Sequence, residues 1–283
     1  MRILHLTDLH LAEPGKLQYG VVDTADQLQR LLGAVPDEWE PEIVVVSGDI
    51  SNDDSQYSYR LALELVGQWA ESRGLQTLWV AGNHDQSEFV ELLHDPKAGH
   101  HLRGVVETSN ATFALLDTRS PGFGYGTMPE IGAELDRLQS CSGERIIVMH
   151  HPPLPAPSAL HHALRLRGYF KWAERVRGAE VSTVLSGHYH LPMRGLWGGA
   201  EVIVGPAVAN LTTTEDWCRE AAVDLHGAQL VETSQGRSAQ LSTIWLGEPD
   251  NQVFQMSPEQ VVAVAQAAGH PNEPGGGIVL PIS

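Results

Sequence analysis

Five short clusters of residues that can bind metal ions each follow directly on a run of aliphatic residues. The runs have the length and the β-branched content of buried strands. In chain order the clusters are Asp8-Leu9-His10, Gly48-Asp49, Gly82-Asn83-His84-Asp85, His150-His151-Pro152-Pro153 and Gly187-His188-Tyr189-His190. In an open α/β sheet the carboxyl ends of the strands share one edge, so residues far apart in the sequence can converge there. The placement therefore predicts a single site built from five strand ends.

The elements expected around these clusters alternate between strand and helix over the first 190 residues. This alternation is typical of an α/β sandwich. Apolar residues recur at helical intervals over residues 23–32 and 56–73, where we predict helices that cover a sheet. The predicted strands are residues 2–7, 43–47, 76–81, 112–117, 145–149 and 181–186.

Beyond about residue 195 the pattern changes to short alternating strands separated by glycine turns, which indicates an antiparallel sheet. We expect a break at residues 247–250 and a last helix at residues 258–268, with Ser257 as its N-cap. The predicted organisation is one domain over residues 1–250, with a C-terminal helix and tail over residues 251–283 appended to it. The predicted antiparallel strands are residues 201–204, 222–225, 229–233 and 239–245.

The amino-acid composition excludes several classes of protein. Hydrophobic residues make up 42% and charged residues 19%, which excludes a disordered, collagenous or coiled-coil chain. A net charge of -17 disfavours stable binding to nucleic acid or to anionic membranes. Only two cysteines are present, the start of the chain lacks a signal-peptide pattern, and no long apolar run suggests a transmembrane segment. We therefore expect a soluble cytoplasmic protein.

The candidate metal ligands combine oxygen and imidazole donors. Seven ligands are too many for one tetrahedral site but enough for two ions, and this donor set suits manganese, iron or zinc. Two ions about 4 Å apart need a shared ligand, for which Asp49 is the candidate, and a bridging hydroxide. The seven are Asp8, His10, Asp49, Asn83, His150, His188 and His190.

Charge counting indicates an anionic substrate for this acidic chain. Two divalent ions outweigh the carboxylates of Asp8 and Asp49 and a hydroxide, and so leave a positive pocket that attracts a phosphodiester. His84 lies beside a candidate ligand but is not needed to bind a metal ion. Its imidazole is free to protonate the leaving oxygen or to stabilise phosphoryl charge.

The five clusters, complete and in order, resemble the signature of the calcineurin-like metallophosphoesterases, and the resemblance spans about residues 1–250. The chain is most similar to the bacterial class III cyclic-nucleotide phosphodiesterases. The resemblance implies a four-layer α/β/β/α sandwich and His84 as the catalytic histidine. It also implies two metal ions, iron and manganese being the usual ones. Asp8, His10, Asp49 and His190 would hold one ion, and Asp49, Asn83, His150 and His188 the other.

The function that we predict is hydrolysis of 3′,5′-cyclic nucleotides, cAMP first, by in-line attack of the bridging hydroxide. One alternative is a broader phosphodiesterase acting on glycerophosphodiesters or 2′,3′-cyclic nucleotides, because the clusters specify a phosphate site and not the leaving group. The segment at residues 121–126 also departs from the histidine-richer loop that we expect in relatives, which bears on substrate preference. Another is a metal-bound scaffold for protein partners. Several family members form homodimers, so self-association is also an option.

The remaining histidines are expected to have structural positions. His5 alternates with leucines on the first predicted strand and is expected to be packed. His151 follows a candidate ligand, and we expect it behind the metal site or at its rim. Solvated loop or helix positions are expected for the others considered: His94, His100, His101, His161 and His162.

Overall fold

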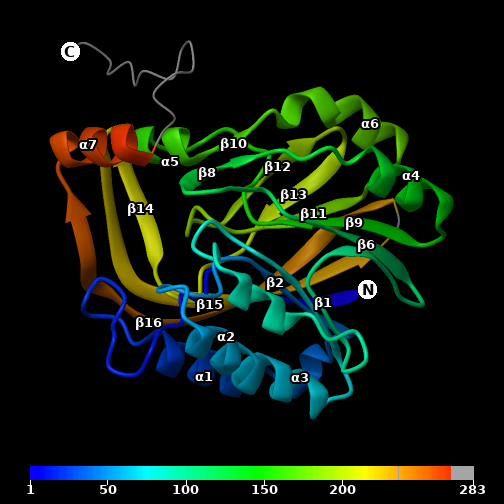
Figure 1. Cartoon of the computed structure of the whole chain (residues 1–283), viewed down its shortest axis with the longest axis horizontal. Helices are drawn as coiled ribbons and strands as arrows, with labels where there is room; N and C mark the ends of the chain where they lie inside the picture. The colour runs from blue at the N-terminus through cyan, green and yellow to red at the C-terminus, as the bar shows by residue number, and fades with distance from the viewer. Residues whose placement is uncertain (235, 269–283) are drawn as a thin grey trace.

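Two β-sheets packed face to face form the centre of the computed structural model, and helices cover their outer faces (Figure 1). The structure describes residues 1–234 and 236–268. The four layers confirm the predicted α/β/β/α sandwich. In the described residues no helix is both long enough and apolar enough to cross a membrane.

The first sheet contains the strands that lead to the first three clusters. Its strand order is β14-β15-β1-β2-β3-β4, and β16 pairs with β15. The strands β1, β2 and β3 are parallel, whereas β15 runs antiparallel to β1. Their bounds are β1 (Arg2–Leu6), β2 (Ile43–Ser47), β3 (Gln76–Val80), β4 (His100–His101), β14 (Leu211–Asp216), β15 (Arg219–Ser234) and β16 (Arg237–Met256).

The second sheet contains the strands that lead to the last two clusters. Its order is β12-β13-β11-β9-β6-β5, with four parallel central strands and antiparallel edge strands. A small third sheet is made of β7 (Arg119–Ser120), β8 (Phe123–Thr127) and β10 (Leu166–Arg167). The strands of the second sheet are β5 (Gly104–Glu107), β6 (Ala111–Leu116), β9 (Glu144–Met149), β11 (Thr183–Ser186), β12 (Met193–Trp197) and β13 (Ala200–Val204).

The core between the sheets explains why the central strands are apolar on both faces. Val45 and Leu78 of the first sheet belong to the same buried cluster as Phe113, Val148 and Leu185 of the second. The alternate residues of these strands pack outward against helices. A strand buried on both faces reads as a continuous aliphatic run, as Ile43–Ser47 does.

Helices cover the two outer faces. The N-cap Asp23 of α1 accepts a hydrogen bond from the backbone of Asp26, and so satisfies a donor that the first helical turn leaves open. The helices on the first sheet are α1 (Thr24–Ala34), α2 (Gln56–Ala62), the π-helical turn η2 (Leu63–Gly67) and α3 (Gln68–Glu71). Those on the second sheet are α4 (Gly132–Ser140) and α6 (Ala173–Gly178), and the short 3₁₀ turns are η1 (Asp37–Trp39), η3 (Glu88–Leu93) and η4 (Tyr169–Trp172).

Two further helices pack on each other at one end of the sandwich. They are α5 (Ala159–Leu164) and α7 (Pro258–Ala268). Figure 1 shows β14, β15 and β16 extending past the sheets to the side where these helices lie. Leu160 and Ala163 of α5 bury Val261 and Ala265 of α7, so the final described helix is attached to the rest of the fold through α5.

The structure corrects several local predictions. The two strands predicted at residues 222–225 and 229–233 are one strand, β15. The break predicted at residues 247–250 is wrong, because β16 runs through it with a bulge in its pairing to β15. The helix predicted at residues 56–73 is interrupted by the π-helical turn. The division of the chain at residue 250 stays a prediction, and the part of the predicted tail at residues 269–283 lies outside the described residues.

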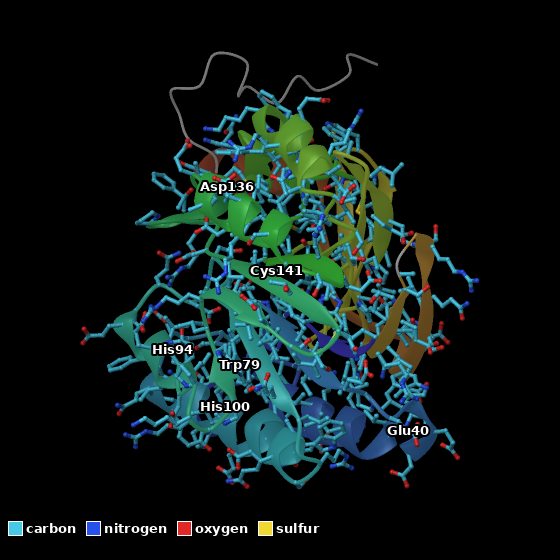
Figure 2. All side chains as sticks on the ribbon, turned by 90° about the vertical axis from the view of Figure 1, so that its right-hand side faces the viewer. Glu40, Trp79, His94, His100, Asp136 and Cys141 are labelled. Atoms are coloured by element: carbon cyan, nitrogen blue, oxygen red, sulfur yellow. The ribbon has the colours of Figure 1, made fainter. Side chains whose placement is uncertain are left out.

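His100 was expected on the surface, and this prediction is wrong. It lies in the edge strand β4 and is buried, with Nδ1 against the hydroxyl of Thr77 and Nε2 at 3.0 Å from Glu71. Figure 2 places His94, Trp79 and His100 in the half of the molecule formed by the first sheet. The partners of His100 come from another strand and a helix, so local sequence spacing could not reveal its burial.

Candidate metal centre

The structure brings the seven predicted ligands together at one end of the two sheets. Each follows the carboxyl end of a strand: β1 for Asp8 and His10, β2 for Asp49, β3 for Asn83 and β9 or β11 for the remaining histidines. The Asp and His side chains of the site form overlapping groups, and within each group the potential ligand atoms all lie within 4.8 Å of one another. The groups are Asp8, His10 and His190; His10, Asp49 and His84; Asp8, Asp49 and His150; and His150, His151 and His188.

Five of the seven residues have a left-handed backbone. Their φ angles are 54° for Asp8, 46° for His10, 48° for Asp49, 74° for His188 and 49° for His190. Residues other than glycine rarely adopt this conformation, and each instance costs about 1–3 kcal/mol unless the surroundings hold it. The strand ends therefore bend sharply to direct these side chains inward, at a cost in local stability that is typical of functional sites.

Three glycines in the clusters allow the strand ends to approach one another. A Cβ atom on Gly48, whose φ is +95°, would lie 2.5 Å from Nδ1 of His150. A Cβ on Gly82 would collide with Asp49, and one on Gly187 would collide with Thr7. These glycines therefore permit a close approach of neighbouring loops that a side chain at the same position would prevent.

One half of the cluster is formed by Asp8, His10 and His190. Nε2 of His10 lies 3.0 Å from Nε2 of His190, and Nε2 of His190 lies 3.5 Å from a carboxylate oxygen of Asp8. Asp8 is fully buried and also accepts hydrogen bonds from the backbone N–H of His188 and the hydroxyl of Thr7. These contacts hold the carboxylate in place at the edge of the sheet.

The other half is formed around His150. Its Nε2 lies 3.3 Å from Asp49 and 3.2 Å from the amide oxygen of Asn83. Asp49 also lies 3.6 Å from Nε2 of His10, so its carboxylate faces both halves. The ring of His188 is 5.0 Å from that of His150. A shared position for Asp49 agrees with the bridging ligand predicted for it.

Hydrogen bonds to backbone carbonyl groups determine which nitrogen of the His150 and His188 rings carries a hydrogen. Nδ1 of His150 donates to the carbonyl of Ser47 at 2.8 Å, and Nε2 of His188 donates to the carbonyl of Leu164 at 3.0 Å. In the neutral rings the other nitrogen then carries a lone pair. For His150 this lone pair faces the acceptor oxygens of Asp49 and Asn83. Acceptors that face acceptors need a cation or a proton between them, so the residues fit divalent metal ions.

The charges within the cluster are strongly coupled. Burial disfavours the charged form of His150, but Asp49 and Asp8 outweigh it and raise the pKa of His150 to about 9. Burial alone would raise the pKa of Asp49, yet His150 and His84 hold it well below its ordinary value. Burial and the charge of His84 lower the pKa of His10 to about 3. Without an ion, the two carboxylates thus favour the protonated form of the imidazole of His150.

His84 differs from the other cluster residues in its exposure. Its side chain is at the surface, and its ring centroid lies 4.8 Å from that of His10. Its backbone N–H donates to Asp49 at 2.8 Å. The predicted catalytic histidine therefore lies at the open rim of the cluster, where a bound molecule can reach it.

Two other histidines occupy the structural positions predicted for them. His5 is buried and its Nε2 contacts the hydroxyl of Ser47 at 2.8 Å. His151 is buried behind the cluster, with Nδ1 at 2.8 Å from the hydroxyl of Thr118 and its ring 4.3 Å from that of His188. The expectation for His161 is wrong, because that side chain is buried, whereas the neighbouring His162 is only half-buried.

Asp85 received no role from sequence reasoning, although it ends the third cluster. Its buried carboxylate accepts hydrogen bonds from the backbone N–H groups of Ile50, Ser51 and Gly82, at 3.1, 3.0 and 2.8 Å. It thereby ties the loop after β2 to the loop after β3. Burial and the charge of Asp49 raise the pKa of Asp85 to about 6. Its position two residues after Asn83 was the only signal available in the sequence.

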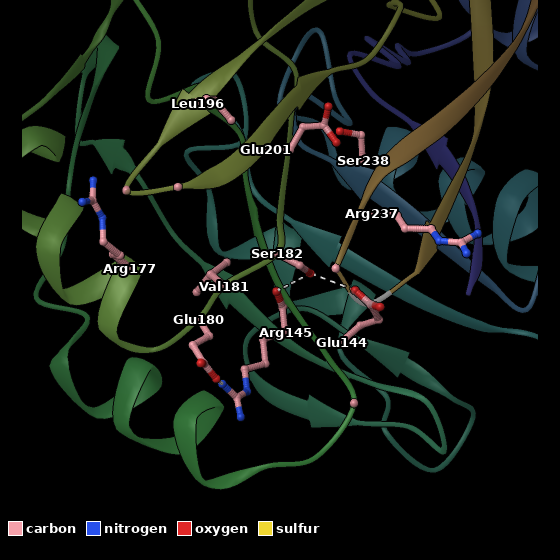
Figure 3. A pocket seen from close by; sticks show the side chains of 14 residues that line it. Glu144, Arg145, Arg177, Glu180, Val181, Ser182, Leu196, Glu201, Arg237 and Ser238 are labelled. Atoms are coloured by element: carbon pink, nitrogen blue, oxygen red, sulfur yellow. Dashed lines mark hydrogen bonds and ion pairs between the residues drawn. The ribbon is translucent and has the colours of Figure 1, made fainter.

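A separate cleft of about 540 Å³ opens at the opposite edge of the second sheet (Figure 3). Glu144, at the start of β9, accepts a hydrogen bond from the hydroxyl of Ser182, and Arg145 pairs with Glu180 at 2.7 Å. The cleft lies at the amino ends of strands whose carboxyl ends carry the clusters. It is therefore distinct from the candidate metal centre.

Comparisons with known proteins agree with this geometry. A sequence profile described as "Calcineurin-like phosphoesterase" matches residues 1–192. A "Probable cyclic nucleotide phosphodiesterase" of Rhodococcus erythropolis is 30% identical over 210 residues, 71% of this chain and 69% of the relative. A "cAMP/cGMP dual specificity phosphodiesterase" of Mycobacterium tuberculosis is 28% identical over 211 residues, 72% of this chain and 66% of the relative. A dimetal phosphatase of Danio rerio has a similar fold, with a TM-score of 0.52 and 16% identity over 78% of this chain and 94% of that chain.

The profile match covers most of the described residues and includes all five clusters. It confirms the predicted family and, with it, the prediction of an enzyme that hydrolyses phosphoesters. The family and the convergent Asp and His side chains together indicate a site for divalent metal ions. The chain belongs to the calcineurin-like phosphoesterase family.

Proposed function

We propose that this chain is a phosphodiesterase with two metal ions that hydrolyses 3′,5′-cyclic nucleotides, cAMP first among them. The observation that carries the proposal is the convergence of acceptor atoms on one point of the cluster: Nε2 of His150 lies 3.3 Å from a carboxylate oxygen of Asp49 and 3.2 Å from the amide oxygen of Asn83. The names of the relatives from Rhodococcus erythropolis and Mycobacterium tuberculosis support cyclic nucleotides as the substrate class.

The ligands are proposed to divide into two sets that share Asp49. The facing nitrogens of His10 and His190, together with Asp8, support the first set. The second set is supported by the contacts of His150 with Asp49 and Asn83 and by the ring of His188 beside it. We propose iron or manganese as the ions, because mixed oxygen and imidazole donors suit them.

Ions held in these two sets would supply positive charge for the phosphate and lower the pKa of a coordinated water. The protein itself contributes orientation and a proton donor. The amide N–H group of Asn83 would contact the phosphate, and His84 at the rim would protonate the departing 3′ oxygen. Protonation of that oxygen converts a poor leaving group into a neutral hydroxyl.

The experiment is a comparison of matched variants. The purified protein is stripped of metal with a chelator and reconstituted with Mn²⁺, and its turnover is then measured with bis(p-nitrophenyl) phosphate and with 3′,5′-cAMP. Removal of a residue that contacts a metal ligand typically lowers activity roughly 10- to 100-fold. We expect the turnover of both substrates by Asn83→Ala to fall by at least this factor. The exposed Asn251 provides the control, since Asn251→Ala should retain the wild-type rate. Equal rates for the three proteins would refute the assignment.

A substrate panel decides between the proposed specificity and its alternatives. The ratio of kcat/KM values for 3′,5′-cAMP, 3′,5′-cGMP, 2′,3′-cAMP and glycerophosphocholine measures the preference directly. A preference for the last two compounds would support the broader phosphodiesterase. Negligible hydrolysis of all four with iron or manganese would support a scaffold role. A cytoplasmic location and a homodimer stay predictions, and the dimer is tested by sedimentation.

A further inference from the structure

We propose that His161 of α5 is a positioning residue for the loop that carries His188 and His190, and that α5 braces this loop. The proposal rests on the metal-binding role proposed above. It concerns a residue that spacing alone would place in solvent. The side chain of His161 is instead 4% exposed.

The helix α5 contacts the loop at two consecutive residues. Nε2 of His161 lies 3.1 Å from the carbonyl oxygen of Tyr189, the residue between the two ligands. The carbonyl oxygen of Leu164, at the end of α5, accepts a hydrogen bond from Nε2 of His188 at 3.0 Å. One short helix thus orients the ring of the first ligand and holds the backbone that leads to the second.

The hydrogen bond to Tyr189 determines the tautomer of His161. A carbonyl oxygen only accepts, so Nε2 of His161 carries a hydrogen and donates it. Nδ1 on the other side of the ring lies 2.7 Å from the hydroxyl of Ser158, which in turn lies 2.7 Å from a carboxylate oxygen of Glu220. Both ring nitrogens therefore have partners, and the ring is fixed between β15 and the ligand loop.

This arrangement goes beyond ordinary packing. Burial of a polar ring costs free energy that an aliphatic side chain would not cost. The ring also packs edge-on against Tyr189, with centroids 4.8 Å apart. The left-handed backbone of His188 and His190, with φ of 74° and 49°, is a conformation that needs external support. The hydrogen bond from His161 supplies that support at the residue between them.

The brace also connects the metal centre to the end of the described chain. Leu160 and Ala163 of α5 pack against Val261 and Ala265 of α7. The N-cap Ser158, which starts α5, is the residue that joins His161 to Glu220 of β15. The position of α5 therefore depends on β15 and α7, and the position of the ligand loop depends on α5.

The test uses replacements that preserve different atoms of the imidazole. Glutamine can place an amide N–H near the position of Nε2, asparagine reaches only the position of Nδ1, and alanine reaches neither. The control is His162→Ala, because His162 is the next residue of the same helix but contacts Trp217 instead of the loop. The measurements on metal-free protein are the affinity for Mn²⁺ by calorimetry, the visible absorption spectrum with Co²⁺, and the thermal unfolding midpoint.

We expect His161→Ala and His161→Asn to bind Mn²⁺ roughly 10- to 100-fold more weakly and to change the Co²⁺ spectrum. His161→Gln should bind within a few-fold of the wild type, and His162→Ala should be unchanged. Wild-type affinity and spectrum in His161→Ala would overturn the proposal. If the alanine variant does not fold, equal affinities of the asparagine and glutamine variants would overturn it.

These readouts separate this inference from the proposed function. A wild-type protein that binds Mn²⁺ tightly but hydrolyses no cyclic nucleotide would contradict the proposed substrate and leave the role of His161 standing. A wild-type protein that hydrolyses cAMP, together with a His161→Ala variant of unchanged metal affinity, would contradict only the positioning role.

Discussion

Replacement of Glu220 by glutamine should change how the stability of the metal-free protein depends on pH. Glu220 is 5% exposed and contacts the hydroxyl of Ser158. Burial raises its pKa from an ordinary value of 4.5 to about 7. In the protonated form it can donate a hydrogen bond to Ser158, whose own hydroxyl hydrogen is then available to Nδ1 of His161. A glutamine amide can donate in the same way at every pH.

The direction of the change in stability with pH follows from whether the folded or the unfolded state holds the proton on Glu220. Between pH 4.5 and 7 the folded protein keeps a proton on Glu220 that the unfolded chain has released, so the folded state loses stability as pH rises through this range. The full difference in pKa corresponds to roughly 3 kcal/mol in the free energy of unfolding, and most of it falls between pH 5 and pH 8. Glutamine does not titrate, so the variant is free of this loss.

The assay is urea unfolding with a chelator present, at pH 5 and at pH 8, for the wild type and Glu220→Gln. We expect the free energy of unfolding of the variant to rise by about 2–3 kcal/mol relative to that of the wild type between the two pH values. The exposed Glu248 gives the control, since Glu248→Gln should follow the wild type. The same pH dependence in all three proteins would refute the reasoning that burial keeps Glu220 protonated.

Three further predictions concern the site and the core. Gly48→Ala should lower the unfolding free energy by at least ~1–3 kcal/mol, because its Cβ would lie 2.5 Å from His150; an unchanged urea midpoint would contradict this. Adding Mn²⁺ at about 100 times its Kd should raise the free energy of unfolding of the wild type by ~2.7 kcal/mol. The same addition should raise the thermal unfolding midpoint of Asp49→Asn by less than that of the wild type. Phe113→Ala should cost ~3–5 kcal/mol in urea unfolding, because Phe113 is buried between the two sheets.

The metal centre could be predicted because its signals are local in the sequence. An aliphatic run that ends in Gly-Asp, or in His-x-His, shows both a buried strand and the chemistry at its end. Parallel strands bring such ends to one edge whatever the length of chain between them. For this reason residues as distant as Asp8 and His190 could be assigned to one site before their 3.5 Å contact was known.

The long ribbon of β15 and β16 shows where such signals mislead. Glycine at residues 227 and 247 reads as a turn, yet Gly227 of β15 pairs with Trp245 of β16, and Gly247 of β16 pairs with Leu225 of β15. A Cβ on Gly247 would collide with the backbone of Asp224, so this glycine serves close approach of two strands. Local propensity cannot distinguish a turn from a crowded strand, because the crowding comes from a partner strand.

The sequence by itself determined the alternation of strands and helices, the strands that end in polar clusters and the donor atoms that those clusters contribute, since each of these follows from side-chain chemistry and short-range periodicity. Only the tertiary structure decided that His100 and His161 are buried and what holds the ligands in place. The partner of His161 is the carbonyl of Tyr189, 28 residues away, and the residue that completes its contacts, Glu220, lies 62 residues from Ser158. The burial and the hydrogen bonds of these polar side chains depend on surfaces that meet only after the chain has folded, so they leave no periodic trace in the sequence.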